Sequence, residues 1–390
     1  MKLDFENIYH LFTIFATFLF SFYLLMNQKK GRRGNVFIGL FILFIGLGSL
    51  DYLLTINFYK EHPATAMILP AFSFLFFPLM YFYILSIAFN GFKLEWKHSI
   101  HLIVFVFFSV SMFFEYHIYS TEIQYIKLTS TDGFRPWFLP TIYVLLHLQA
   151  LFYMVLSILA VLKYKKLVNE NYSSLKNRNY KWIISLTFVF VFITLSGLFR
   201  NIMRFFINPE IDDYLIYIMA PLNFLFLIWL IYKAMSQPFL FTGIDTQVQL
   251  VEDYIKENKL LEKRRTLENE EEFNNEDTVI MQQLESYMQE QNAFLNPSLS
   301  IFDLAKGLGF SSNQLSVFLN RRLNKNFFDF VNDYRINLAK EILSDPIKKK
   351  TTVLEILYKV RFNSKSSFNT AFKKSTGLTP SEYRKVNMKA

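Results

Sequence analysis

Apolar and polar positions divide the first 235 residues into long apolar stretches separated by short polar gaps. Seven stretches run for about 19–26 residues, the length that an α-helix needs to cross roughly 30 Å of hydrocarbon. They are Ile8–Met26, Val36–Phe58, Met67–Phe89, Ser99–Tyr119, Trp137–Leu162, Trp182–Ile207 and Tyr214–Met235. We therefore expect residues 1–235 to form a seven-helix transmembrane bundle.

The loops between these stretches differ in positive charge, which predicts an orientation in the membrane. The first, third and fifth loops hold twelve Lys and Arg residues, whereas the second, fourth and sixth hold three. Because cytoplasmic loops carry the excess of Lys and Arg, we expect the N-terminus outside and the C-terminus in the cytoplasm. A cleaved signal peptide is the alternative for the first stretch, but Asp4, Glu6 and the length of the apolar run argue against it.

Residues 236–277 are polar and acidic, and we interpret them as a cytoplasmic juxtamembrane linker. Val248, Val251 and Ile255 form a short apolar stripe that predicts a helix over Gln247–Arg265. This helix pairs with a second copy in a dimer, transmits a rotation from the last span, or is a solvated juxtamembrane helix. The following stretch, Glu268–Asp277, is acidic and lacks periodicity, which predicts a flexible tether.

Residues 278–390 return to the pattern of a soluble helical domain. A first helix is predicted over Asp277–Gln291. Its apolar positions available for burial are Val279, Leu284 and Met288. Capping boxes then open helices after Ser300 and Ser311, because each Ser precedes an Asp or a Gln by three residues. Two short helices joined by a tight glycine-containing turn predict a helix-turn-helix.

The same pattern repeats further along the chain at a spacing of 52 to 53 residues. A long helix is predicted over Phe327–Leu343, and further capping boxes open helices after Thr352 and Thr379. A rigid central helix holds the two recognition helices at a fixed separation. That arrangement suits two successive major grooves, which lie about 34 Å apart on one face of DNA. The whole chain is therefore expected to be all-α.

Charge and composition narrow the function. The net charge is +7 over residues 1–235, −6 over 236–279 and +8 over 280–390, so the last region suits a polyanionic partner. Cysteine is absent, which excludes thiolate metal sites, iron–sulfur clusters and a cysteine nucleophile. The six histidines form no HExxH motif, and no glycine-rich phosphate loop is present. We expect no catalytic residues, no metal site, no cofactor and no enzymatic activity.

Residues Asn296–Arg384, about a quarter of the chain, resemble the tandem helix-turn-helix domain of the AraC/XylS family of transcription regulators. The closing FKKSTGLTPSEYR is the most specific part of the resemblance. The preceding apolar spans are similar to the membrane-embedded members of that family. Arg361 departs from the pattern, because the family usually has Gly at that turn, and Val317 stands where a polar or basic residue is common.

The resemblance implies roles for residues on both recognition helices. The base-facing positions would be Asn313, Ser316, Val317 and Asn320 in the first unit, and Lys365, Ser366, Ser367, Asn369 and Thr370 in the second. The phosphate-binding positions would be Arg321, Arg322, Lys373 and Lys374. Asn pairs bidentately with adenine, and Val contacts the thymine methyl group.

Ionisable residues inside the apolar stretches are costly and usually face the interior of a bundle. They are Asp51, Glu115, His147, Arg200 and Arg204. One interpretation is a polar sensor pocket that opens to the outside and receives a ligand. The alternative is a structural ion-pair network that joins helices, with Arg204 snorkelling to the interface.

The sequence as a whole predicts a one-component sensor, in which a transmembrane domain couples a stimulus to a DNA-binding transcription regulator. The expected location is the bacterial cytoplasmic (inner) membrane, with multiple spans and the DNA-binding domain in the cytoplasm. The expected partners are double-stranded DNA, membrane lipid, an unknown small-molecule or envelope stimulus and a second copy in a homodimer. The alternative is a transporter or channel-like protein with a regulatory DNA-binding domain.

Overall fold

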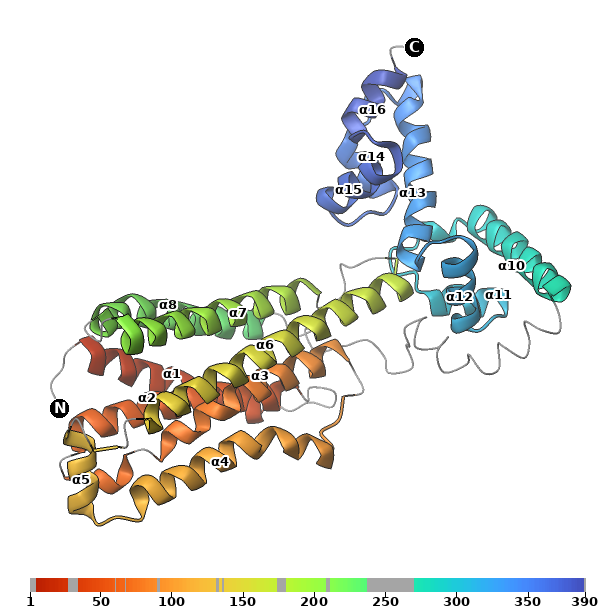
Figure 1. The fold of residues 1–390 in the computed structure, drawn as a ribbon. Helices are drawn as coiled ribbons and strands as arrows, with labels where there is room; N and C mark the ends of the chain where they lie inside the picture. Colours follow the sequence, from red (N-terminus) through yellow and green to blue (C-terminus); the bar gives the residue numbers. More distant parts are fainter. Residues whose placement is uncertain are drawn as a thin grey trace. The chain divides into compact units, whose positions relative to one another are not determined.

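The computed structural model describes most of the chain and is helical throughout the described part (Figure 1). The described residues are 5–26, 34–59, 61–66, 68–89, 92–130, 133–134, 137–173, 180–207, 211–236 and 270–388. Within them every regular element is a helix, and an isolated antiparallel bridge joins Tyr172 and Ser300. The chain divides into two compact units, residues 1–162 with 179–245 and residues 163–178 with 246–390.

The first unit contains the long apolar helices. They are α1 (Phe5–Met26), α2 (Gly34–Phe58), α3 (Ser73–Ala88), α4 (Ile103–Met112), α6 (Phe138–Asn171), α7 (Tyr180–Ile202) and α8 (Ile211–Ser236). Short elements extend or connect them: η1 (Pro63–Thr65), η2 (Leu69–Phe72), η3 (Trp96–Leu102), η4 (Phe113–His117), α5 (Thr121–Thr129) and η5 (Met203–Ile207). Each of the seven predicted apolar stretches coincides with one of these helices or with a helix and its extension.

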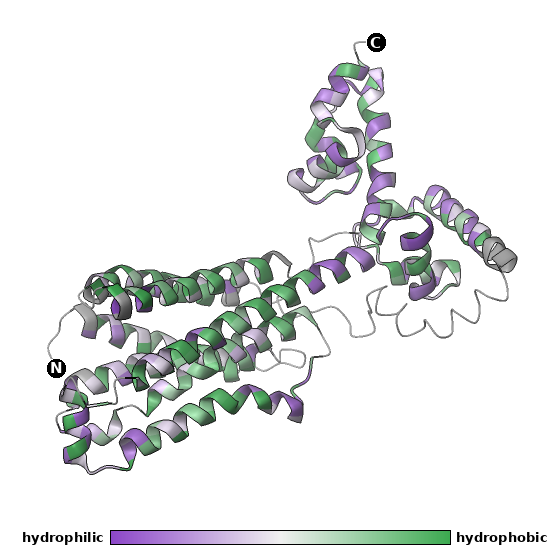
Figure 2. Cartoon of the chain, viewed as in Figure 1, coloured by the Kyte–Doolittle hydropathy of each residue, from purple (hydrophilic) through white to green (hydrophobic). Residues whose placement is uncertain are grey.

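Six helical segments in the described part are long and apolar enough to cross a membrane. The predicted seventh stretch lies in α8, where the apolar portion Tyr217–Lys233 is shorter. These helices consist largely of apolar residues, as the hydropathy colouring shows (Figure 2), and many of the apolar side chains are exposed. Phe15 and Phe188, for example, are 68% and 71% exposed. Soluble proteins rarely expose large contiguous apolar patches.

Three features of the first unit differ from the simple pattern of straight spans. The fourth stretch is built from three geometries in succession, the 3₁₀ segment η3, the α-helix α4 and the π-helical turn η4. The amphipathic helix α5 lies in the fourth loop, where no helix was predicted. Helix α6 continues to Asn171, nine residues beyond the predicted end of its span at Leu162.

The extension of α6 has a sequence basis that the span pattern hides. Tyr164, Leu167, Val168 and Asn171 recur at helical spacing and are buried, although Lys163, Lys165 and Lys166 lie among them. The lysines mark the end of the apolar span, whereas the buried stripe keeps the backbone helical. This end of α6 belongs to the second unit.

The second unit has seven α-helices in its described C-terminal part. They are α10 (Glu270–Glu290), α11 (Ile301–Leu308), α12 (Ser312–Arg322), α13 (Phe327–Ser344), α14 (Val353–Lys359), α15 (Lys365–Thr376) and α16 (Pro380–Asn387). Two apolar cores meet along α13. Phe327, Phe330 and Val331 belong to the first core with α10–α12, whereas Ile336 and Ala339 belong to the second with α14–α16. The central helix therefore joins two separately packed halves.

The acidic tether predicted over Glu268–Asp277 is wrong from Glu270 onward, because α10 begins there. Glu is a good helix former, and negative charge near a helix N-terminus interacts favourably with the helix dipole. Leu284 and Met288 are buried as predicted, but Val279 is 48% exposed and Ile280 and Met281 pack against the core instead. The helix predicted over Gln247–Arg265 lies outside the described residues.

Candidate DNA-binding surface

Two helix-turn-helix units, α11–α12 and α14–α15, are built by local interactions that the sequence specifies. Ser300 and Asp303 form a reciprocal capping box at α11, and Thr352 and Glu355 form one at α14. Ser311 caps α12 in the same way, with its backbone N–H donating to Oε1 of Gln314 at 3.0 Å. Each box satisfies backbone donors that a helix start leaves unpaired. The predicted capping boxes are confirmed.

The second recognition helix begins with a cap that was not predicted. The Ser364 hydroxyl accepts a hydrogen bond from the Ser367 backbone N–H at 3.2 Å. The Ser367 hydroxyl in turn donates to the Ser364 carbonyl oxygen at 3.0 Å. This cap uses the side chain of Ser367, one of the residues expected to face bases.

One residue in the turn of each helix-turn-helix unit has a positive φ, although it is Gly in the first turn and Arg in the second. Gly309 has a φ of 76° and Arg361 a φ of 63°. The following residues make equivalent bonds, Phe310 N–H to the Ala305 carbonyl at 2.9 Å and Phe362 N–H to the Leu357 carbonyl at 3.0 Å. Arg361 therefore preserves the turn and adopts a left-handed conformation that costs an L-residue roughly 1–2 kcal/mol.

The first recognition helix, α12, presents a polar face of limited exposure. Asn313, Val317 and Asn320 are partly exposed, whereas Ser316 is only 6% exposed. The Asn320 side-chain amide donates to the Ser316 carbonyl oxygen at 2.9 Å. Burial of Ser316 argues against a direct contact between its hydroxyl and a base.

The second recognition helix, α15, is more open. Lys365, Ser366 and Thr370 are exposed, and Asn369 is half-buried on the same helix. Phe368 and Phe372 are fully buried and hold the opposite face of α15 in the second core. The helix therefore has one apolar face and one accessible polar face, as the sequence pattern predicts.

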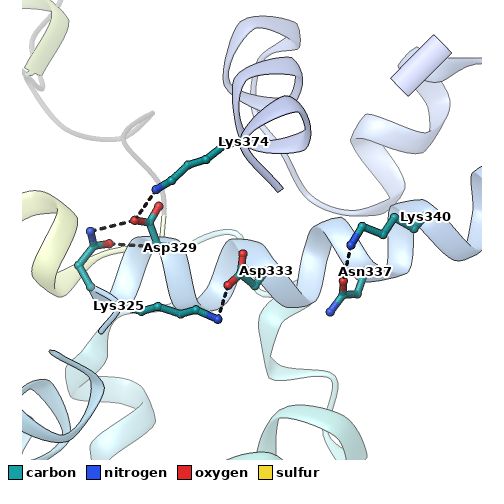
Figure 3. Close-up of polar contacts among 7 residues, drawn as sticks. Lys325, Asp329, Asp333, Asn337, Lys340 and Lys374 are labelled. Carbon is teal, nitrogen blue, oxygen red and sulfur yellow. Dashed lines mark hydrogen bonds and ion pairs between the residues drawn. The ribbon is translucent and has the colours of Figure 1, made fainter. Parts of the chain in front are cut away.

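Arg322 and Lys374, which are among the expected phosphate ligands, form ion pairs with carboxylates. The Arg322 guanidinium pairs with the carboxylate of Asp277 on α10. Lys374 reaches from α15 to Asp329 on α13, with a Nζ–Oδ2 distance of 2.8 Å (Figure 3). The other two expected ligands, Arg321 and Lys373, are exposed. Exposed pairs of this kind contribute little stability.

Further polar contacts lie along α13. Asn326 caps the helix, because its side-chain oxygen accepts the Asp329 backbone N–H at 2.8 Å. The Lys325 ammonium pairs with Asp333 at 2.7 Å, and the Lys340 ammonium donates to the Asn337 side-chain oxygen at 3.2 Å (Figure 3). Lys374 is the member of this group that comes from α15, so its pair with Asp329 links the second recognition helix to the beginning of the central helix.

The ionisable residues of the apolar helices have distinct partners. Glu115 is buried and its Oε1 lies 3.4 Å from the Lys127 ammonium of α5. His147 Nε2 is 2.8 Å from the Asn201 side-chain amide, which joins α6 to α7. The Asp51 carboxylate accepts a hydrogen bond from the Leu69 backbone.

These partners bear on the predicted sensor pocket. Arg200 and Arg204 are half-buried at the end of α7 and in η5. The contacts of Glu115 with Lys127 and of His147 with Asn201 fit a structural network that joins helices at least as well as they fit a ligand site. A mostly apolar hollow of about 370 Å³ lies between η2 and α4, and among the described residues none of the five predicted sensor residues lines it.

Arg335 is a functional candidate that the sequence reasoning missed. It is 1% exposed and lies on the buried face of α13, four residues from both Val331 and Ala339. Burial lowers the pKa of its guanidinium to about 10, so the side chain stays charged at neutral pH. A cation on an apolar helical stripe is the signal that could have identified it.

The Arg335 guanidinium donates to oxygen atoms on three segments. Its Nε is 2.7 Å from the Phe294 carbonyl oxygen and its Nη2 is 3.0 Å from the Asn296 carbonyl oxygen. Its Nη1 donates to the Ser173 carbonyl oxygen at 3.1 Å and to the side-chain oxygen of Asn332 at 3.3 Å. Neutral oxygens therefore satisfy a buried charge, as burial of an ionised group requires.

Two capped helix-turn-helix units that share a central helix define a tandem helix-turn-helix domain. Residues 304–386 match the family model described as "Helix-turn-helix domain". The C-terminal part of the chain thus carries a helix-turn-helix domain of the AraC type.

Two proteins of Bacillus subtilis (strain 168) are similar to this part of the chain. Over 89 residues it is 34% identical to the "Uncharacterized HTH-type transcriptional regulator YdeC", covering 23% of this chain and 30% of YdeC. Over 86 residues it is 29% identical to the "Uncharacterized HTH-type transcriptional regulator YtdP", covering 22% of this chain and 11% of YtdP. The chain therefore spans less than a third of the length of either relative. No solved structure matches the chain.

Proposed function

We propose that this protein is a membrane-bound, sequence-specific transcription regulator whose transmembrane helices couple a stimulus to DNA binding. The observation that carries the proposal is the combination in one chain of a tandem helix-turn-helix domain with six helices long and apolar enough to span a membrane. The relatives named as transcriptional regulators support the DNA-binding half. The apolar outer surfaces of the N-terminal helices support the membrane half.

Both recognition helices contact DNA in this proposal. Asn313, Val317 and Asn320 of α12 face bases in one major groove, and accessible residues of α15 face bases in the next. The α15 set is Lys365, Ser366, Asn369 and Thr370. Ser316 is left out of the set because it is buried, and Ser367 because its hydroxyl donates to the Ser364 carbonyl oxygen.

Phosphate contacts position the domain without reading sequence. Arg321 and Lys373 are exposed and are proposed to bind phosphates directly. Arg322 and Lys374 exchange Asp277 and Asp329 for phosphate oxygens on binding. The released carboxylates remain on the protein, so the net gain from Arg322 and Lys374 is smaller than the attraction between each cation and phosphate alone.

The membrane half is proposed to have seven spans, with the N-terminus outside and the DNA-binding domain in the cytoplasm. The Lys and Arg bias of the loops supports this orientation. The polar residues Asp51, Glu115, His147, Arg200 and Arg204 are proposed to form the part of the bundle whose arrangement the stimulus changes. A stimulus shifts the bundle only if it binds one arrangement more tightly than the other.

Two experiments test the proposal. Membranes from expressing cells are washed with alkaline carbonate, and the full chain should remain in the pellet; recovery in the wash would contradict the membrane half. The full chain, solubilised in detergent, is used to select sites from a random DNA pool at two salt concentrations. Two boxes about 10 base pairs apart are expected. Weak, sequence-independent binding that disappears with salt would contradict sequence-specific recognition.

A further inference from the structure

The end of helix α6 makes specific contacts with the helix-turn-helix domain, and both sides of these contacts belong to the second unit. Tyr172 and Ser300 form an antiparallel bridge. The Ser173 backbone N–H donates to the Leu299 carbonyl oxygen at 3.1 Å, and the Ser173 hydroxyl donates to the same oxygen at 2.8 Å. Asn171, Tyr172 and Ser173 are all buried. The segment therefore contributes backbone and side-chain hydrogen bonds as well as burial.

Arg335 completes this contact from the side of the central helix. Its guanidinium donates to the Ser173 carbonyl oxygen at 3.1 Å and lies 3.4 Å from the Ser173 hydroxyl oxygen. If the α6 end were removed, a fully buried guanidinium would lose these two partners. Leaving a buried donor unsatisfied is costly, and more so when the donor is charged. The site is thus built to receive a backbone carbonyl and hydroxyl at this position.

The contact lies at the entrance of the first helix-turn-helix unit. Leu299 is buried in the first core, and Ser300 is the N-cap of α11. Helix α11 packs in that core with Leu315 and Phe318 of the recognition helix α12. A displacement of residues 172–173 therefore acts on the residues that fix the start of α11, and through the shared core on α12.

Helix α6 is long enough to connect this contact to the membrane. It has 34 residues, which correspond to roughly 50 Å at 1.5 Å per residue, against about 30 Å of hydrocarbon. It begins in the first unit and ends in the second without interruption, and Figure 1 shows it as one continuous helix. A continuous helix transmits translation and rotation between its ends.

We propose that residues 163–173, at the end of α6, are a docked input element that couples the apolar helices to the first helix-turn-helix unit. The docking surface is formed by Phe294, Asn296, Leu299, Ser300 and Arg335, and its occupant is the α6 end of the same chain. The input therefore enters the domain at α11, separately from the covalent connection through residues 237–269. The inference rests on the proposed function in assigning α6 to the membrane.

An engineered disulfide tests the contact in the full chain, which has no native cysteine. Facing residues of an antiparallel pair have Cβ atoms about 4.5–5.5 Å apart, close enough for a disulfide after small adjustments. The variant Tyr172→Cys/Ser300→Cys is oxidised in native membranes. A protease site is inserted between residues 237 and 269 and cleaved. If the disulfide has formed, the N-terminal and C-terminal fragments stay linked in the absence of reductant.

The matched control is Tyr172→Cys/Thr352→Cys. Thr352 is the N-cap of α14, as Ser300 is the N-cap of α11. Each double variant therefore removes one equivalent N-cap side chain. The expected result is a reducible link in the first pair and none in the control. No link in the first pair, or equal linking in both, would overturn the docking.

Hydrogen exchange of the full chain tests whether the contact acts on the recognition helix. Ser173→Pro removes the N–H that donates to Leu299, whereas Ser173→Ala keeps that N–H and removes only the hydroxyl. Amides of α11 and α12 should exchange about tenfold faster in Ser173→Pro, with a smaller change in Ser173→Ala. Unchanged exchange in α11 and α12 in Ser173→Pro would overturn the coupling. Neither readout requires DNA binding, so failure of the proposed function would appear separately in the site selection.

Discussion

Arg361 stands at a turn where glycine is expected, yet its backbone adopts the left-handed conformation that glycine favours. The left-handed conformation at this turn is nearly free for Gly but is unfavourable for an L-residue with a Cβ atom. Gly309 occupies the same position in the first unit, with a φ of 76° against 63° for Arg361. The turn of the second helix-turn-helix unit therefore carries a conformational cost that the turn of the first helix-turn-helix unit avoids with Gly309.

Replacing Arg361 with Gly should stabilise the DNA-binding domain. The expected gain is about 1 kcal/mol, which corresponds to a rise in Tm of roughly 4 °C for a domain of this size. Thermal unfolding of fragment 270–390 measures it. The mirrored variant Gly309→Ala should lower Tm, because the added Cβ has open space around it and only the backbone conformation is penalised. A lower Tm for Arg361→Gly would contradict the strain argument.

Asn369 and Lys373 lie on the same helix and should affect DNA binding in different ways. Asn369→Ala should relax sequence preference in one box and weaken binding to the selected site by about 1–3 kcal/mol. Lys373→Ala should weaken binding to all sequences and reduce the slope of log affinity against log salt by about 1. Titrations at several salt concentrations, on selected and scrambled DNA, measure both. An unchanged salt slope in Lys373→Ala would remove it from the phosphate contacts.

At the scale of elements, the capping boxes make stability depend on pH. Backbone and side-chain hydrogen bonds from Thr379 lower the pKa of Glu382, and those from Thr352 lower the pKa of Glu355. A carboxylate whose pKa is lowered on folding stabilises the domain above its unfolded pKa of about 4.3. The stabilisation is lost as the pH falls through the lowered folded pKa.

Glu382→Gln should therefore reduce the loss of Tm of fragment 270–390 between pH 7 and pH 3. The amide does not titrate, and Gln314 already fills the same role in the box of α12. Thermal unfolding at both pH values measures the change. If Glu382→Gln lost as much Tm as the unchanged fragment, the ionised cap would not be the source of the pH dependence.

The elements that the sequence predicts well are those determined by residues close together in the chain. Each capping box joins residues three positions apart. Each apolar span is defined by residues of a single helical segment. The start of α10 was misplaced because an acidic segment without apolar periodicity is typical of both a tether and a capped helix start. The π-helical turns η4 and η5 change the hydrogen-bond register without a distinct residue pattern.

The contacts that the sequence could not predict join distant residues. The Ser173–Leu299 hydrogen bond spans 126 positions, and the contacts of Arg335 with Ser173 span 162. Lys163, Lys165 and Lys166 correctly mark the end of an apolar span but conceal the helix that continues through them. Similarly, the role expected for Ser316 followed from the family resemblance, whereas its burial depends on the packing of the whole helix-turn-helix unit.

At the scale of the whole molecule, the polar residues of the apolar helices should matter for regulation and not for DNA recognition. Arg200→Ala and Asp51→Asn should abolish the regulated change in a reporter driven from the selected site. DNA binding to that site by the two full-chain variants, solubilised in detergent, should stay unchanged. Glu61→Gln, an exposed acidic residue outside the helices, is the control and should leave regulation unchanged. Normal regulation in both Arg200→Ala and Asp51→Asn would remove these residues from the input.

The central claim is that one chain holds a sequence-specific DNA reader at the membrane. The most direct measurement incubates a random DNA pool with washed, inside-out membrane vesicles that carry the full chain, and then sequences the DNA that sediments with them. The account predicts enrichment of a two-part site with boxes about 10 base pairs apart. It also predicts loss of that enrichment in vesicles carrying a chain truncated after residue 269. Equal recovery of all sequences, or sedimentation of the same DNA with truncated chains, would contradict the claim.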